Sequence, residues 1–279
     1  MTKKQGLTGF QLKYLALICM VLDHIHYFFD YTGKIPLLFS QVGRIAAPLF
    51  LFCIVEGFIY TRNRKRYFLR IYSLAILMGL IHFGFYNFLS PLVRKDGFFP
   101  QNMMLSSFAI LIVALQGIDW LKQKQYWQGS IAVLLSVGLP FLFAPLYQIA
   151  MSSENAALSF SLNLLNFTLF PTWSSIADGG IYTLIVGVSL YLCRRHRIGQ
   201  LVTFVMLSLL VNLGIPALLG FTFTWQGLID QLYEWMGVFA VIPMALYNGE
   251  KGQGNKSLFY WFYPVHIYLL YAVSVLLYH

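Results

Sequence analysis

Charged and titratable side chains inside long apolar runs are the residues of this sequence best suited to chemistry. Asp23 and His24 are adjacent in the first such run, and Lys13 precedes His24 by eleven residues. Eleven residues make about three turns of an α-helix, so Lys13 and His24 project from nearly one face, with a rise of about 16 Å between them. An imidazole beside a carboxylate is a base that works near neutral pH. The pattern predicts a catalytic base at His24, oriented or charge-balanced by Asp23; a satisfied core histidine is the alternative.

Two opposite-charge pairs share one antiparallel register between the first two apolar runs. Pairing Asp23 with Arg44 places the centre of the hairpin near residue 34, and pairing Lys13 with Glu56 places it within one residue of that point. Charges inside apolar helices are costly, so each is expected to have a partner. Such ion pairs can also serve only to hold two helices together, and this structural role is the one favoured for Lys13 with Glu56.

A basic tract follows the second apolar run and continues one turn into the third. The candidate ligand-binding residues in it are Arg62, Asn63, Arg64, Arg66, Tyr67 and Arg70. Guanidinium groups at this density are suited to the phosphates of a nucleotide-type cofactor. A cytoplasmic loop in contact with anionic lipids produces the same composition, so both interpretations stay open.

Further polar groups lie at or inside the ends of later runs. His266 follows Pro264 by two residues and is a candidate for assisting proton transfer, whereas Asn102 and Asp178 are caps or ligands. His82 and Glu234 are additional candidates for which the sequence indicates no partner.

The elements that must position these residues are membrane-spanning helices. Of the 279 residues, 58% are hydrophobic and only 10% are charged, and the apolar runs are about 20 residues long, as a bilayer requires. We therefore expect an all-α integral membrane protein forming a single domain over 1–279. About nine spans are expected: 10–29, 42–60, 67–89, 102–120, 127–147, 177–193, 198–219, 227–247 and 258–278.

The distribution of basic residues predicts the orientation. Alternate loops hold Lys3, Lys4, Arg62, Arg64, Lys65, Arg66, Lys122, Lys124, Arg194, Arg195, Arg197, Lys251 and Lys256, and the opposite loops hold only Lys34, Arg94 and Lys95. This asymmetry predicts a cytoplasmic amino terminus in a multi-pass protein of the cell membrane. It also accounts for the net charge of +9, so nucleic acid is not an expected partner. The segment 148–175 is expected on the outer side, as a re-entrant or interfacial stretch.

Several of these residues together resemble a known family. They are Leu12-Lys13, Asp23-His24, Gly43-Arg44, Pro48-Leu49-Phe50, Glu56-Gly57-Phe58, Thr61-Arg62-Asn63, Tyr67 and Arg70, with Asn102 and Tyr263-Pro264-Val265-His266 later in the chain. This set resembles the TraX family, whose namesake is the F-pilin acetylase, within a wider group of transmembrane acyltransferases. The chain departs from that pattern at Gly79-Leu80-Ile81-His82-Phe83, where the family usually has a polar residue and Pro-Phe.

The resemblance implies acetyl-CoA as the acyl donor, with its phosphates against the basic tract and its pantetheine arm along the face marked by Lys13. No metal is implied. His24 would then deprotonate an amine or hydroxyl acceptor belonging to a peptide, a glycan or a lipid at the outer side. Direct transfer and a covalent acyl-histidine both stay open.

Two other function classes fit the same charges. A secondary transporter or flippase would use them as a proton or substrate path near the midplane. A non-catalytic assembly or immunity factor would tolerate the loss of His24, which separates it from a transferase.

Overall fold

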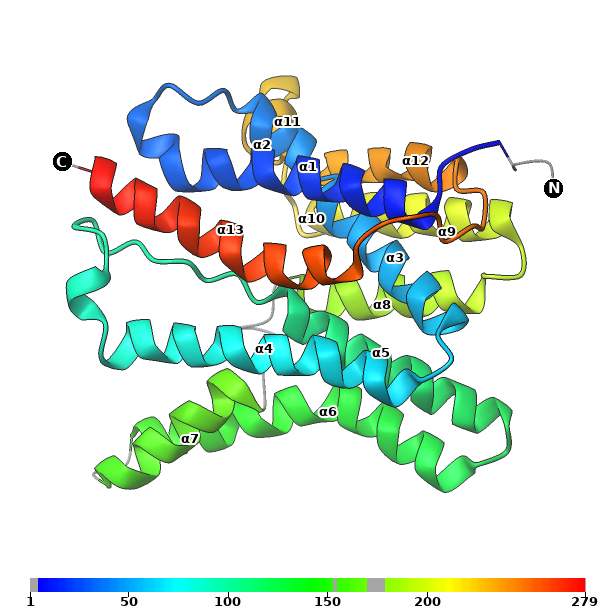
Figure 1. The fold of residues 1–279 in the computed structure, drawn as a ribbon, viewed down its shortest axis with the longest axis horizontal. Helices are drawn as coiled ribbons and strands as arrows, with labels where there is room; N and C mark the ends of the chain where they lie inside the picture. The colour runs from blue at the N-terminus through cyan, green and yellow to red at the C-terminus, as the bar shows by residue number, and fades with distance from the viewer. Residues whose placement is uncertain (1–4, 153–154, 170–178, 279) are drawn as a thin grey trace. The chain divides into compact units, whose positions relative to one another are not determined.

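The computed structural model describes residues 5–152, 155–169 and 179–278. The expected all-α class is confirmed, because these ranges contain no β-strand beyond one isolated bridge between Leu7 and Tyr247. The α-helices are α1 (Gly9–Phe29), α2 (Leu38–Gly43), α3 (Ala46–Tyr60), α4 (Arg64–Asn87), α5 (Met104–Lys122), α6 (Tyr126–Met151), α7 (Ala156–Thr168), α8 (Gly180–Leu192), α9 (Arg197–Leu209), α10 (Ile215–Leu218), α11 (Trp225–Asp230), α12 (Val241–Ala245) and α13 (Lys256–Leu277). Figure 1 shows their course.

Six helical stretches in the described residues are long and apolar enough to cross a membrane. They are Gly9–Thr32, Leu38–Tyr60, Arg64–Asn87, Met104–Lys122, Arg197–Leu218 and Ser257–Leu277. Of the other expected spans, 127–147 lies within the 26-residue helix α6, and 177–193 contains α8, which has 13 residues. These stretches make the chain a membrane protein.

The range 227–247 is not the single long helix that its hydropathy predicts. It contains α11, a 3-10 helix over Tyr233–Ala240 and α12. A Cβ added at Gly237 would lie 3.2 Å from the carbonyl oxygen of Arg44, so the chain there passes close to another backbone. Pro243 also lacks the N–H that a continuous helix requires.

Side chains cap the helices that carry the candidate residues. Thr8 and Gln11 form a capping box at the start of α1. The Asn63 side chain accepts a hydrogen bond of 2.8 Å from the backbone N–H of Arg66 at the start of α4. These caps satisfy N–H groups that the first helical turn leaves without intrahelical partners.

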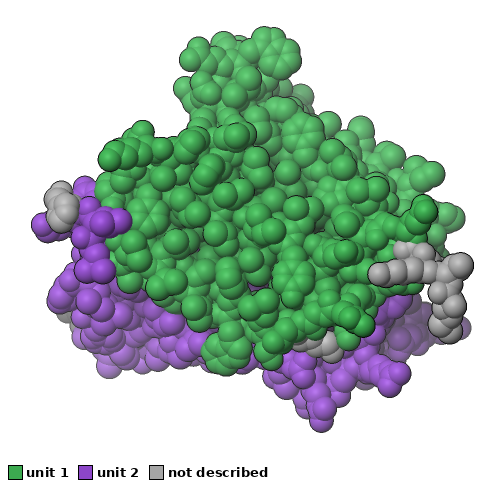
Figure 2. Space-filling model, turned by 45° about the horizontal axis from the view of Figure 1, so that its top comes forward, with its two compact units in different colours: residues 1–57, 189–274 green, residues 58–188, 275–279 purple. Residues whose placement is uncertain are grey.

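The described chain consists of two compact units, coloured separately in Figure 2. Unit 1 comprises Met1–Gly57 and Ser189–Ser274, and unit 2 comprises Phe58–Val188 and Val275–His279. Each unit draws on segments far apart in the sequence. The expectation of one transferase-like domain over the whole chain stays a prediction.

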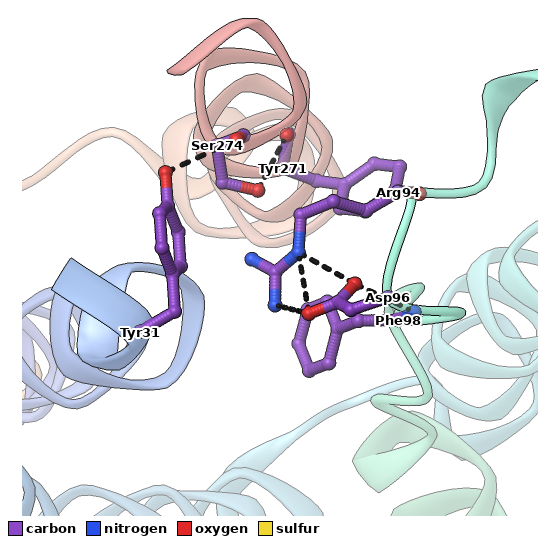
Figure 3. Close-up of polar contacts among 6 residues, drawn as sticks. All are labelled: Tyr31, Arg94, Asp96, Phe98, Tyr271 and Ser274. Carbon is purple, nitrogen blue, oxygen red and sulfur yellow. Dashed lines mark hydrogen bonds and ion pairs between the residues drawn. The ribbon is translucent and has the colours of Figure 1, made fainter. Parts of the chain in front are cut away.

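Unit 1 is built on close packing of α1 against α2 and α13. A Cβ added at Gly43 would lie 2.3 Å from the Cβ of Asp23, so only glycine lets α2 approach α1 this closely. Cys19, Met20 and Ala46 form a buried core cluster there. Near the other end of α13, the Tyr31 hydroxyl donates a 3.2 Å hydrogen bond to the carbonyl oxygen of Ser274 (Figure 3).

Unit 2 contains α4 to α7 and most of α8. Helices α5 and α6 cross at Gly117 and Gly129, where a Cβ on either glycine would lie about 3 Å from the other's carbonyl oxygen. Helix α7 packs on α4 and α6 and lies within the expected outer segment 148–175, whose residues 153–154 and 170–175 fall outside the described residues. The backbone of α7 reaches α4 at Gly79, where a Cβ would lie 1.9 Å from the carbonyl oxygen of Phe167.

A tight turn between α4 and α5 holds a buried arginine. Two nitrogens of Arg94 bind the Asp96 carboxylate at 2.8 to 3.1 Å (Figure 3). The Arg94 guanidinium also lies 4.2 Å from the ring centroid of Phe98 and 4.9 Å from that of Tyr278. Gly97, with φ of 83°, makes the turn possible.

Candidate active site

The two histidines predicted to be catalytic meet in unit 1. Nδ1 of His24 on α1 lies 2.7 Å from Nε2 of His266 on α13, and both side chains are 6% exposed. The two rings are stacked, with centroids 4.9 Å apart and planes 15° from parallel. Residues 242 positions apart in the sequence thus form one buried imidazole pair.

A backbone carbonyl determines which ring nitrogens of this pair carry protons. Nδ1 of His266 lies 2.7 Å from the carbonyl oxygen of Phe262, which can only accept. In the neutral pair His266 therefore carries its proton on Nδ1 and accepts at Nε2, so His24 donates from Nδ1. The lone pair of His24 is then on Nε2, which is the ring nitrogen able to take a proton.

Aromatic rings hold the pair in place. The Phe262 ring is stacked on His266 at 4.9 Å, and Phe28 meets His24 edge-on at 6.0 Å. Pro264, two residues after Phe262 in α13, has no N–H to contribute to the hydrogen-bond ladder of that helix. Packing of this kind restricts rotation of both imidazoles, as a positioned base requires.

Asp23 forms the ion pair that the sequence register predicts. Its Oδ1 lies 2.5 Å from Nη2 of Arg44, and Nη1 of Arg44 binds Glu234 at 2.8 Å. Glu234, for which the sequence indicated no partner, therefore belongs to this network. Arg44 bridges a largely buried carboxylate and one whose side chain is 60% exposed.

The expected pairing of Lys13 with Glu56 is wrong. The Lys13 ammonium lies 5.5 Å from the ring centroid of Phe10 and 5.8 Å from that of Phe259. Glu56 instead accepts a hydrogen bond from Tyr247 and interacts with Arg197. Glu56 is held by residues from the carboxyl-terminal part of the chain, and Lys13 lies between a ring of its own helix and one from that part. A comparison of two neighbouring helices does not include these distant partners.

Arg197, for which the sequence predicts only a role in topology, contacts several residues of unit 1. Its guanidinium donates to Gln200 at 2.7 Å and to the carbonyl oxygen of Met244. It also lies 4.7 Å from the ring centroid of Phe52. Arg197 is the first residue of α9, and its contacts with Met244 and Phe52 join segments that are far apart in the sequence, which no local pattern indicates.

The basic tract divides into two kinds of residue within unit 2. Arg64 binds Asp119 at 2.5 Å and lies 4.3 Å from the Phe58 ring centroid, while Asn63 caps α4. Tyr67 is half-buried. Arg62, Arg66 and Arg70 are exposed, and among the described residues none has a carboxylate within 4.0 Å. These three side chains therefore differ from Arg64, which has a carboxylate partner.

The two remaining candidates have no confirmed role. Asn102 is half-buried one residue before Met103, which is the N-cap of α5, so Asn102 is not itself that cap. Asp178 lies outside the described residues.

Comparison with known proteins agrees with the resemblance noted from the sequence. A family model described as TraX protein matches residues 8–274. The chain is 26% identical over 286 residues to the probable fimbrial assembly protein FimC, serogroup H1, of Dichelobacter nodosus, a match that covers 99% of this chain and all of that protein. No solved structure matches the chain. Because the family match extends over nearly the whole sequence, the chain belongs to the TraX family.

Proposed function

We propose that this chain is a membrane-embedded acyltransferase that moves an acetyl group from cytoplasmic acetyl-CoA to an amine or hydroxyl at the outer side of the membrane. The observation that supports this proposal is the His24–His266 pair. The direction of its hydrogen bonds leaves Nε2 of His24 as the basic nitrogen. A buried base held by a second imidazole is typical of a site for proton transfer.

In this proposal His24 takes a proton from the acceptor through Nε2. The acceptor nitrogen or oxygen then attacks the thioester carbonyl carbon that acetyl-CoA supplies, the carbon–sulfur bond breaks, and the thiolate takes the proton. While His24 is charged, its Nδ1–H donates more strongly to His266, and the Phe262 carbonyl holds the far proton of that ring. The two imidazoles thereby share the transient positive charge.

Arg62, Arg66 and Arg70 are proposed to bind the donor's phosphates. Arg66 and Arg70 are four residues apart on α4 and so lie on one helix face, and their guanidinium groups are not neutralised by described carboxylates. Arg64, held by Asp119, and Asn63, held as a cap, are left out of this role. Contact of Lys13 with the donor remains a prediction from the sequence.

A peptide amino terminus is the acceptor that we propose first. A relative is named a probable fimbrial assembly protein, and we infer a related role in fimbrial assembly for this chain. We further propose a location in the cell membrane, a cytoplasmic amino terminus and about nine crossings. Beyond the six long apolar stretches, the crossings would be α6, α8 and the segment from α11 to α12.

The test is release of CoA from acetyl-CoA by the purified protein in detergent. His24→Ala is expected to abolish an acceptor-dependent release that the wild type shows. His26→Ala is the matched control, because His26 is on the same helix and contacts Asp30 at 3.3 Å. Equal loss in both variants, or none in either, would argue against His24 as the base.

A further inference from the structure

The face between α4 and α7 in unit 2 has an unusual composition for a helix–helix contact. Gly79, His82, Phe83 and Tyr86 share one face of α4 at helical spacing, and Phe160, Asn163, Asn166 and Phe167 lie on the facing side of α7. The ring pairs fix the register: Phe83 meets Phe160 at 5.3 Å, and His82 meets Phe167 at 4.9 Å. The helices are antiparallel, because the Tyr72 hydroxyl donates a 3.2 Å hydrogen bond to the carbonyl oxygen of Leu169 toward one end of the contact, and the ring centroid of Phe88 lies 6.2 Å from that of Phe160 toward the other. Both asparagines lie between Phe160 and Phe167 on α7.

Three polar atoms on this face lack hydrogen-bond partners. They are Nδ1 of His82, Oδ1 of Asn163 and Oδ1 of Asn166, each buried and without a bond to any described residue. The three side chains are only 5%, 7% and 2% exposed, respectively. More than nine in ten buried polar groups in proteins have a partner, and orphans are especially costly where lipid replaces water. Three buried acceptors without a described donor on one interface are able to take hydrogen bonds from a ligand.

The chemistry of the orphaned atoms specifies that group. The two amide oxygens accept hydrogen bonds, and Nδ1 of His82 also accepts when the imidazole proton is on Nε2. A primary ammonium has three N–H donors and no acceptor, which matches three acceptors. A hydroxyl supplies only one donor.

Aromatic rings around His82 suit the same group. Phe167, Phe99 and Tyr86 surround the imidazole at centroid distances of 4.9, 5.5 and 6.3 Å. Rings grouped in this way bind cationic nitrogen through their electron-rich faces. The surrounding cluster also carries no formal positive charge that would repel a cation.

We propose that the α4–α7 face is a binding site for a primary ammonium group. His82, Asn163 and Asn166 accept its three hydrogen bonds, and the rings of Phe99, Tyr86 and Phe167 line its surroundings. The site consists of unit 2 residues alone, so it stands whether or not the chain transfers acyl groups. Peptide amino termini and ethanolamine lipid headgroups both carry this chemistry.

The test is thermal unfolding of the full-length protein in detergent, titrated with butylammonium chloride at constant ionic strength. Butyltrimethylammonium has the same charge without N–H donors, and 1-butanol has a single donor. The wild type is expected to show a saturable rise in Tm of about 3 °C at ten times Kd with butylammonium only. An equal response to all three compounds, or to none, would overturn the proposal.

Variants locate the response. Asn163→Leu and Asn166→Leu remove orphaned atoms, so they are expected to fold at least as stably as the wild type while losing the butylammonium shift. Ser161→Ala alters an exposed residue of the same helix and should keep it. His24→Ala should also keep the shift, which separates this site from the transferase proposal. Leucine variants that retain the full shift would place binding elsewhere and refute the site.

A last comparison identifies the natural source of the ammonium. A short peptide with a free amino terminus is compared with its acetylated form, and phosphatidylethanolamine with phosphatidylcholine. Stabilisation by the free peptide alone supports a peptide ligand, and stabilisation by phosphatidylethanolamine alone supports a lipid. Either result upholds the ammonium site, and equal effects within both pairs would contradict it.

Discussion

Nε2 of His266 lies 2.7 Å from Nδ1 of His24, while the other nitrogen of His266 is bound to the Phe262 carbonyl oxygen. In the proposed mechanism His266 would serve as a positioning residue, because its Nε2 accepts from Nδ1 of His24 and so selects the tautomer of His24. The relationship assigns the basic nitrogen of neutral His24 to Nε2.

Replacing His266 tests that role. His266→Phe keeps an aromatic ring but removes the acceptor, so kcat should fall by about 100-fold, within the range that a positioned base contributes. His266→Gln places an amide oxygen where it can accept from His24 Nδ1 and should restore part of kcat. Steady-state kinetics of both variants, with their pH profiles, would measure this. Equal kcat in the two variants would mean that His266 serves only packing.

The Arg44 network makes a prediction about stability. Arg44→Met leaves the largely buried carboxylate of Asp23 unpaired and should lower the free energy of unfolding by about 3 kcal/mol. Glu234→Gln should cost less than about 1 kcal/mol, because the Glu234 side chain is mostly exposed. Unfolding in mixed micelles with a denaturing detergent would measure both changes.

The double variant Asp23→Leu with Arg44→Met is the control for this network. It removes both charges and should recover most of the lost stability. A double variant no more stable than Arg44→Met alone would show that the arginine stabilises the unit through other contacts.

The division of the basic tract predicts different kinetic effects for its arginines. Arg66→Gln and Arg70→Gln should each raise KM for acetyl-CoA by about tenfold, the value of one charge-assisted hydrogen bond. The effect should weaken with added salt. Arg64→Gln should change KM little and instead lower Tm, because Arg64 is bound to Asp119. An equal rise in KM for all three would contradict the division.

The Arg94–Asp96 pair predicts acid sensitivity. Hydrogen bonds from Arg94 hold the pKa of Asp96 below its ordinary value. Because the pKa is lower in the folded state, ionised Asp96 contributes stability above about pH 4, and this contribution is lost as the pH falls through the folded-state pKa. Asp96→Asn should thus lower Tm at neutral pH but not in strong acid. A difference in Tm that is the same at both pH values would exclude the linkage.

Features encoded in short sequence separations could be predicted from the sequence. The all-helical class follows from apolar runs of bilayer length, and the Asp23–Arg44 pair follows from two helices joined by a short connection. The family follows from a dense set of residues in the first seventy positions and agrees with the match over 8–274.

Features that depend on distant segments could not be predicted. Glu56 meets Tyr247, Arg64 meets Asp119, and the orientation of His24 depends on a residue 242 positions away. The helix expected over 227–247 is broken where Gly237 passes close to the backbone of Arg44. A hydropathy profile depends on local composition and does not indicate contact with a distant backbone.

The most direct test of the transferase proposal is transfer of isotopically labelled acetyl from acetyl-CoA to a peptide amine by the protein in liposomes, with no ion gradient imposed. We expect labelled product equal to the CoA released, and the loss of both in His24→Ala. Absence of product without a gradient, together with solute movement that requires one, would contradict the proposal and identify a transporter.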